Sequence, residues 1–247
     1  MADWLYRLTY EVVGRMRFLS HKELMRAMVR AFRRARLPLA YSQGYHPHPR
    51  LSFGPPRSTG MAATNEQLDA RLTEPREPAE CTAALDRELP NGLRIVRAEE
   101  LDPRAPSITA STRAGHYACA WPAGAAPPTD SICRLLAQTE ISCARTAGGG
   151  GREVNLRPGV YDIRWQPPNV AMHLALSPGL HVRPQEVLAA LSGWPDDAVR
   201  RIIVTRTGQE IAPSEPGCPM EMYGPRNSCR HPGNSGTKDS DCRGHGS

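Results

Sequence analysis

Residues 20–53, SHKELMRAMVRAFRRARLPLAYSQGYHPHPRLSF, hold the strongest folding signals of the chain. Ser20 followed by Glu23 is a capping box, in which each side chain binds the backbone N–H of the other residue at a helix start. Leu37-Pro38 predicts the end of this helix, because proline disfavours helical geometry in the residue before it. Apolar residues between these limits recur at helical spacing and predict a buried stripe: Leu24, Ala27, Met28, Ala31, Phe32 and Ala35.

A second face of the predicted helix is cationic. Residues 14–50 hold nine Arg/Lys side chains against the single acid Glu23, so this window has a formal charge of +8 while the rest of the chain sums to −2. Such a local field suits a phosphate backbone or an acidic protein surface. Arginine is favoured over lysine throughout the chain, however, and this bias inflates apparent phosphate-binding patches.

A stiff polar loop is predicted after the helix, over residues 42–50, because Pro47 and Pro49 restrict its backbone. Rigid loops with polar and aromatic side chains often carry function. The alternative is a solvated helix face followed by an ordinary Pro-rich turn. The candidate binding residues of the helix, the loop and a later stretch are Arg15, Arg17, Lys22, Arg26, Arg30, Arg33, Arg34, Tyr41, Gln43, Tyr45, His46, His48, Arg50, Arg152 and Arg157.

Strand and helix patterns alternate along the chain. Up to residue 96 their order is β-α-β-β-α-β, which is that of a ferredoxin-like unit. After a connector over residues 101–114 this order is predicted to repeat. We therefore expect an α+β protein of two tandem ferredoxin-like (βαββαβ) units, over residues 1–110 and 111–212. Residues 213–247 have almost no aliphatic side chains, so a disordered C-terminal tail is expected. The predicted strands lie at 6–12, 39–41, 50–53, 68–72, 93–96, 116–121, 141–145, 161–165, 170–176 and 201–206, and the predicted helices at 20–35, 78–89, 130–138 and 184–191.

Cysteine usage and hydropathy restrict the protein class. Seven widely spaced cysteines do not predict a disulfide framework, and no C-x₃-C-x₂-C run is present to ligate an iron–sulfur cluster. Residues 1–10 lack the pattern of a signal peptide, and no apolar stretch is long enough to span a membrane. We expect a cytoplasmic protein without a membrane span, a metal site or a cofactor of its own.

The stretch GRMRFLSHKELMRAMVRAFRRARLPLAYSQGYHPHPRLSFGPP resembles the signature of the uncharacterised radical-SAM-associated family. Its members are short stand-alone proteins, or C-terminal extensions of radical S-adenosylmethionine proteins with a cobalamin-binding-like domain. Similarity continues in EQLDARLTEP, ELPNGLRIVRAEEL and GREVNLRPGVYDI, where the family more often has an acidic residue at the position of Asn155. The resemblance covers residues 4–205 and implies a separate radical-SAM partner, but no catalytic residues.

Three functional hypotheses follow. In the first, the protein is an accessory module that holds RNA or a ribonucleoprotein for the radical-SAM partner, with bases stacked on Tyr41, Tyr45 and Phe53. In the second, it is a metal-independent RNA-acting enzyme that uses His21, His46 and His48 as acid/base groups, because imidazole titrates near neutral pH. In the third, it is a docking scaffold whose arginine face meets an acidic protein. A metal-handling role through His46-x-His48 is a remaining alternative, but two ligands do not make a site.

Overall fold

The structure is a computed structural model, and it describes residues 3–126, 128–147 and 150–212 of the 247-residue chain. The predicted disordered tail over 213–247 lies outside the described residues. Ten strands are found in the described part: β1 (Trp4–Val12), β2 (Leu51–Phe53), β3 (Ala62–Leu72), β4 (Leu93–Leu101), β5 (Thr112–Ala120), β6 (Ser142–Ala147), β7 (Gly150–Asn155), β8 (Val160–Gln166), β9 (Asn169–Ala175) and β10 (Val204–Ile211). The α-helices of the same part are α1 (His21–Arg34), α2 (Pro78–Asp86), α3 (Ile108–Ser111), α4 (Thr129–Ala137), α5 (Pro184–Ser192) and α6 (Asp196–Arg201).

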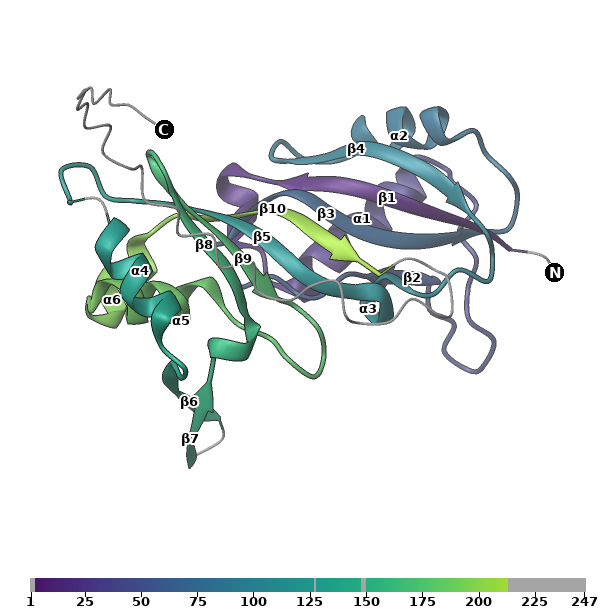
Figure 1. The fold of residues 1–247 in the computed structure, drawn as a ribbon. Coiled ribbons are helices and arrows are strands. Elements are labelled where there is room, and N and C mark those ends of the chain that lie inside the picture. Colours follow the sequence, from purple (N-terminus) through teal and green to yellow (C-terminus); the bar gives the residue numbers. More distant parts are fainter. Residues whose placement is uncertain (1–2, 127, 148–149, 213–247) are drawn as a thin grey trace, which may run out of the picture.

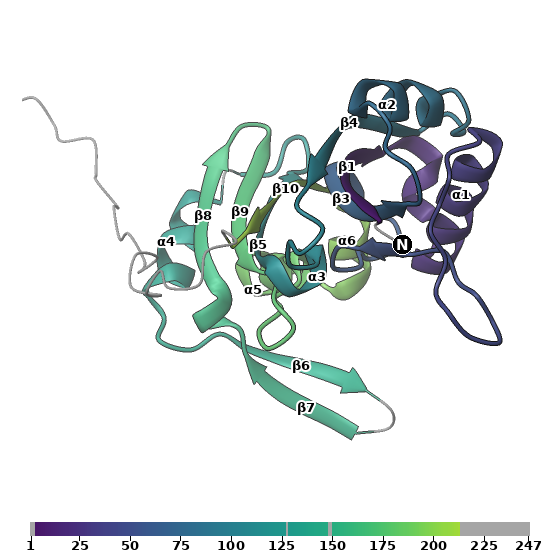
Figure 2. The same cartoon turned by 90° about the vertical axis from the view of Figure 1, so that its right-hand side faces the viewer.

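One large mixed sheet organises the molecule (Figure 1). Seven of its eight strands follow the order β4-β1-β3-β10-β5-β9-β8, and the eighth, β2, pairs with β3 beside this path. β6 and β7 form a separate two-stranded hairpin that extends away from the sheet (Figure 2). The strand predicted at residues 141–145 therefore belongs to this hairpin and not to the main sheet.

The prediction of two tandem ferredoxin-like units is wrong. β10 pairs in parallel with β3, through Thr205 opposite Ala62 and Arg206 opposite Ala63, so strands from both halves of the chain share one sheet. A buried ion pair lies at this junction, where Arg206 donates from Nε and Nη2 to the two carboxylate oxygens of Glu66 at 2.6 Å each. The chain is a single β-rich α+β domain. Alternating patterns predict strands, but they do not reveal which strand edges pair.

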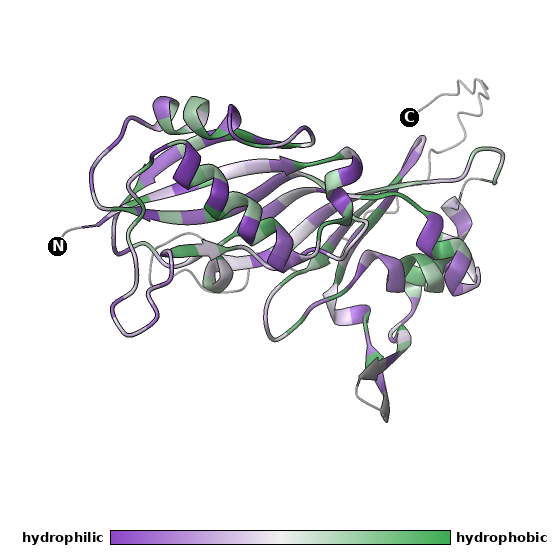
Figure 3. Cartoon of the chain, turned by 180° about the vertical axis from the view of Figure 1, so that it is seen from behind, coloured by the Kyte–Doolittle hydropathy of each residue, from purple (hydrophilic) through white to green (hydrophobic). Residues whose placement is uncertain are grey.

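The structure confirms the predicted start of α1. The Ser20 hydroxyl accepts a hydrogen bond from the Glu23 backbone N–H at 3.3 Å, and the Glu23 carboxylate accepts one from the Ser20 N–H at 2.8 Å. Arg36 adopts a left-handed conformation with φ of 54° directly before Leu37-Pro38, which ends the helix. Figure 3 shows α1 lying lengthwise across the sheet.

Two apolar cores hold the helices on the sheet. α1 buries the predicted stripe against β1, β3 and β4, where Leu24, Met28 and Phe32 are nearly inaccessible to solvent, and α2 adds Cys81 and Leu85 to the same core. α4, α5 and α6 cover β5, β8 and β9 in the same way, around Tyr117 and Leu174. Within the described residues no helix is long and apolar enough to cross a membrane.

Candidate nucleic-acid interface

The outer face of α1 carries a row of cations. Lys22, Arg26, Arg30 and Arg33 are all exposed, and none of them is within 4 Å of a carboxylate in the described part of the chain. Because the helix rises about 1.5 Å per residue, these side chains recur roughly every 6 Å along it. We call these four residues the α1 cation row.

Two predicted binding arginines have carboxylate partners instead. Arg34 Nε binds Glu88 Oε2 at 2.9 Å, which links the last turn of α1 to the segment after α2. Arg50 forms an ion pair with Asp3 near the start of β1. Their positive charges are partly compensated, so the α1 cation row holds the larger share of available charge.

A 3₁₀ turn, residues 14–18, places cations and an aromatic ring just before α1. Arg15 is exposed, and the Arg17 guanidinium lies 4.8 Å from the ring centre of Phe18. Phe18 itself is 58% exposed, so much of its ring is open to solvent. Arg57 fixes the turn by donating to the carbonyl of Arg17 at 2.7 Å and to that of Met61 at 2.9 Å.

The loop over residues 41–50 projects beyond the far end of α1 (Figure 2). Its base is closed by two hydrogen bonds, from Ser42 N–H to the His48 carbonyl at 2.8 Å and from His48 N–H to the Ser42 hydroxyl at 2.9 Å. At its tip Tyr45 is 94% exposed, and its ring meets that of His46 edge to face at 4.8 Å. Gln43 and Tyr41 are also exposed. The loop therefore presents aromatic and polar side chains from a closed base.

A cleft of about 480 Å³ opens beside this loop. Its lining includes His48, Arg50 and Arg71 together with Asp69, whose carboxylate is held by Arg7 Nε and Nη2 at 2.7 and 3.0 Å. The volume falls within the range of small-molecule sites, which is about 300–1,000 Å³. The cleft thus joins the predicted residues His48 and Arg50 to Arg71, an arginine that the sequence did not single out.

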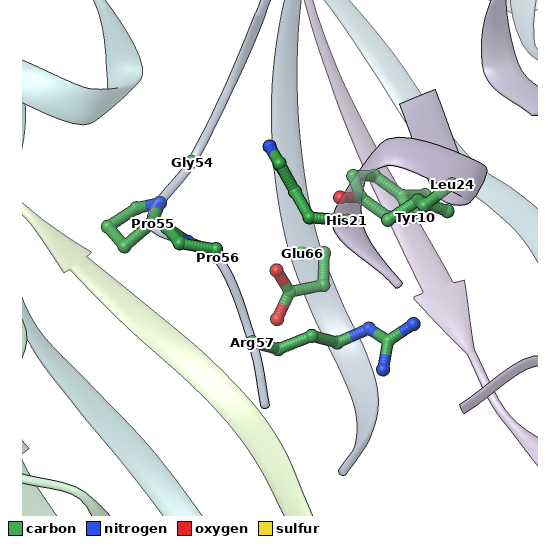
Figure 4. Close-up of a pocket in the computed structure, with 8 residues that line it drawn as sticks. All are labelled: Tyr10, His21, Leu24, Gly54, Pro55, Pro56, Arg57 and Glu66. Carbon is green, nitrogen blue, oxygen red and sulfur yellow. The ribbon is translucent and has the colours of Figure 1, made fainter. Parts of the chain in front are cut away.

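His21 lies at the other end of α1, in the first turn (Figure 4). It borders a cavity of about 10 Å³ together with Arg57 and Glu66, and such a space holds about one water molecule. Burial and the nearby Arg57 charge lower the pKa of His21, which favours its neutral form. Its ring packs edge to face on Phe53 at 5.7 Å.

The three histidines of the enzyme hypothesis are not brought together. α1 separates His21 from the loop that carries His46 and His48, and its 14 residues span about 21 Å. Phe53 is buried, so its ring has little surface for a base. The cavity beside His21 has no room for a nucleotide, whereas the cleft beside His48 does.

The two later candidates lie away from α1. Arg152 is exposed on β7, in the projecting hairpin. Arg157 has a structural position, because its guanidinium donates to the carbonyls of Leu136, Gln138 and Val160 at 2.9–3.1 Å.

Sequence reasoning missed a polar cluster on β5, β9 and β10. His116, His173 and Glu210 place their ligand atoms within 4.8 Å of one another. The available signal was the position of His173, the one ionisable side chain in the predicted strand over 170–176. The sequence did not indicate that β5 and β10 would lie beside it.

Comparison with known proteins gives a family and no curated relative. A family model described as "Uncharacterized protein conserved in bacteria (DUF2344)" matches residues 5–185, and this range includes α1, the loop and the cleft. No curated protein matches the chain.

Proposed function

The chain belongs to the family of uncharacterized proteins conserved in bacteria, DUF2344, and we propose that it binds single-stranded RNA along α1 and the 41–50 loop. The α1 cation row carries this proposal. Its four side chains lack a carboxylate partner in the described chain, so they keep their full charge for an external anion. A row of this kind contacts phosphates, which supply most of the affinity in nucleic-acid binding.

Exposed aromatic rings lie beyond both ends of this row. Phe18 stands before the first turn of α1, next to Arg17, and Tyr45 stands on the loop after its last turn. Every base has a π-face, so such rings hold single-stranded nucleic acid with little sequence preference. The combination of a cation row with terminal stacking rings favours RNA over an acidic protein surface.

The cleft beside the loop supplies a place for selectivity. Its volume of about 480 Å³ accommodates a nucleotide, and Arg71 provides a cation for a phosphate, beside Arg50, whose charge Asp3 partly compensates. His48 and Ser107 offer hydrogen-bonding groups for a base or ribose edge. Phosphate contacts on α1 position the strand, and the cleft reads one of its nucleotides.

The resemblance to radical-SAM-associated proteins extends the proposal to a partner. In this role the chain holds RNA, or a ribonucleoprotein, for a separate radical-SAM protein that performs the chemistry. An accessory role accounts for two features of the molecule. The binding surface on α1 is open, and the cavity beside His21 is too small for a substrate.

Fluorescence anisotropy with a labelled single-stranded RNA tests the proposal. The α1 variant is Arg26→Gln/Arg30→Gln/Arg33→Gln. A matched control, Arg134→Gln/Arg200→Gln/Arg201→Gln, removes the same charge from exposed positions on α4 and α6. For each phosphate contact to a single strand, the binding affinity varies with about the −0.7 power of the salt concentration. Losing three such contacts should therefore weaken binding roughly 50-fold at 0.15 M salt.

The control variant should bind RNA within about twofold of the wild type. Equal affinity of the wild type and the α1 variant would contradict the proposal. If the α1 variant binds RNA normally but no longer captures a radical-SAM protein, the surface is a protein-docking site.

A further inference from the structure

Three side chains converge on one face of the sheet, on strands that take no part in the RNA proposal. His116 on β5 lies directly opposite His173 on β9 in the antiparallel register. Their rings stack at 4.4 Å with an interplanar angle of 18°. Glu210 comes from β10, on the other side of β5, and its Oε1 lies 2.9 Å from His116 Nε2 and 3.2 Å from His173 Nε2.

The alternation of the strands sets the direction of this cluster. Tyr117, Met172 and Leu174 are the sequence neighbours of the two histidines, and all three are buried in the core under α4–α6. Because successive side chains of a strand point to opposite faces, His116 and His173 face away from those helices. The side chains are 44% exposed for His116, 21% for His173 and 37% for Glu210, so the cluster is open to solvent on one side.

The distances in the cluster match those between ligands of one metal ion. Two ligand atoms of a tetrahedral ion with bonds of about 2.1 Å lie roughly 3.4 Å apart. The two histidine–carboxylate distances of 2.9 and 3.2 Å are close to this value. The three ligand atoms all lie within 4.8 Å of one another, so a small rotation of the side chains brings all three within bonding distance of one ion.

A second observation points to a missing ligand. His173 Nε2 is a buried atom, and its contact with Glu210 Oε1 at 3.2 Å lacks the geometry of a hydrogen bond. Buried polar atoms in folded proteins are rarely left unsatisfied, and an ion is one of the recognised explanations. One carboxylate oxygen of Glu210 serves both rings, at 2.9 Å from His116 Nε2 and 3.2 Å from His173 Nε2.

The surroundings hold the rings in place and leave space around them. Tyr161 packs against the His173 ring at 5.0 Å. Gly208 lies opposite His116 in the register, and a Cβ atom at this position would make an ordinary van der Waals contact of 3.6 Å with the His116 ring.

We propose that His116, His173 and Glu210 bind one divalent transition-metal ion, with Zn²⁺ as the best match. Two imidazoles and one carboxylate are a ligand set of zinc sites that keep an open position for water or an anion. Fully closed structural zinc sites use four protein ligands, whereas three converge here among the residues that the structure describes. The open side of the cluster is where water, a carboxylate or a phosphate oxygen would complete the coordination.

Metal binding by the full-length chain tests this site. The first measurement is the zinc content and Zn²⁺ affinity of the wild type and of Glu210→Gln, His116→Ala and His173→Ala. Glu210→Gln keeps the shape of the side chain, so it reports on ligation even if a histidine variant is unstable. The matched control is His46→Ala/His48→Ala, which removes the other closely spaced histidine pair.

Co²⁺ is the second probe, because the chain also carries Cys218, Cys229 and Cys242. Ligation by nitrogen and oxygen gives weak visible bands, whereas thiolates add an intense near-ultraviolet charge-transfer band. We expect one ion per wild-type chain, no thiolate band, and at least about 100-fold weaker binding in Glu210→Gln, since even outer-shell changes cost 10–100-fold. The control should keep wild-type affinity. Absence of stoichiometric metal in the wild type, unchanged affinity in Glu210→Gln, or a thiolate band would each overturn the proposal.

Discussion

Replacing Glu66 by glutamine should destabilise the protein strongly, because Glu66 neutralises the most deeply buried cation at the junction of β3 and β10. Arg206 is 1% exposed and Glu66 3% exposed, and two hydrogen bonds of 2.6 Å join them. Arg206 also donates to the Pro55 carbonyl at 2.9 Å. Glu66→Gln keeps the volume of the side chain but leaves the guanidinium without a counter-charge.

Breaking a buried ion pair by removing one partner costs about 3–5 kcal/mol. A domain of this size loses roughly 2–4 °C in Tm per kcal/mol, so Tm should fall by about 6–20 °C. Thermal and urea unfolding followed by circular dichroism measure this change. The double variant Glu66→Gln/Arg206→Met removes both charges and should recover most of the loss. A loss below about 1 kcal/mol in Glu66→Gln, or no recovery in the double variant, would refute the reasoning.

Two further predictions concern the cap of α1 and the second core. Ser20→Ala should lower the free energy of unfolding by about 1 kcal/mol at pH 7. Hydrogen bonds from Ser20 lower the pKa of Glu23, so the stabilisation they give is present above the ordinary value of 4.5 and is lost as pH falls through the lowered pKa. The Tm difference between Ser20→Ala and the wild type should therefore narrow below pH 4.5, and an equal difference at pH 3 and pH 7 would contradict this. Burial raises the pKa of Cys119 to about 12, so iodoacetamide at pH 8 should leave this thiol unmodified in the native protein and alkylate it in urea. Peptide mass spectrometry decides the point, and alkylation of native Cys119 would show that the core around it opens.

The sequence predicted α1 well because its signals are local. The capping box, the buried stripe and the proline stop all lie within one short stretch, and each acts on neighbouring residues. The same locality explains why the candidate interface was accessible to prediction. The α1 cation row and the 41–50 loop follow from the spacing of charges and prolines.

Local sequence patterns do not predict which charged side chains are buried. Asp69 alternates with Leu68 and Ala70, which predicts an outward carboxylate, yet Asp69 is only 4% exposed. Arg7 and the backbone N–H of Ile108 hold it, because α3 and its flanking segment cover that face of the sheet. No pattern within β3 reveals which distant segment will cover it.

The pairing of distant strands limited the rest. Glu66 and Arg206 meet because β10 pairs with β3, and the metal-site residues meet because β5 lies between β9 and β10. Each of these side chains is unremarkable in its own strand. The cleft likewise depends on Ser107, from a connector for which the sequence predicted no structure.

The salt dependence of RNA binding tests the central proposal most directly. Log affinity plotted against log salt concentration has a slope of about −0.7 for each phosphate contact to a single strand. Arg26→Gln/Arg30→Gln/Arg33→Gln should therefore flatten the slope by about 2, while Arg134→Gln/Arg200→Gln/Arg201→Gln leaves it unchanged. Equal slopes for the wild type and the α1 variant would show that the α1 cation row does not contact the RNA backbone.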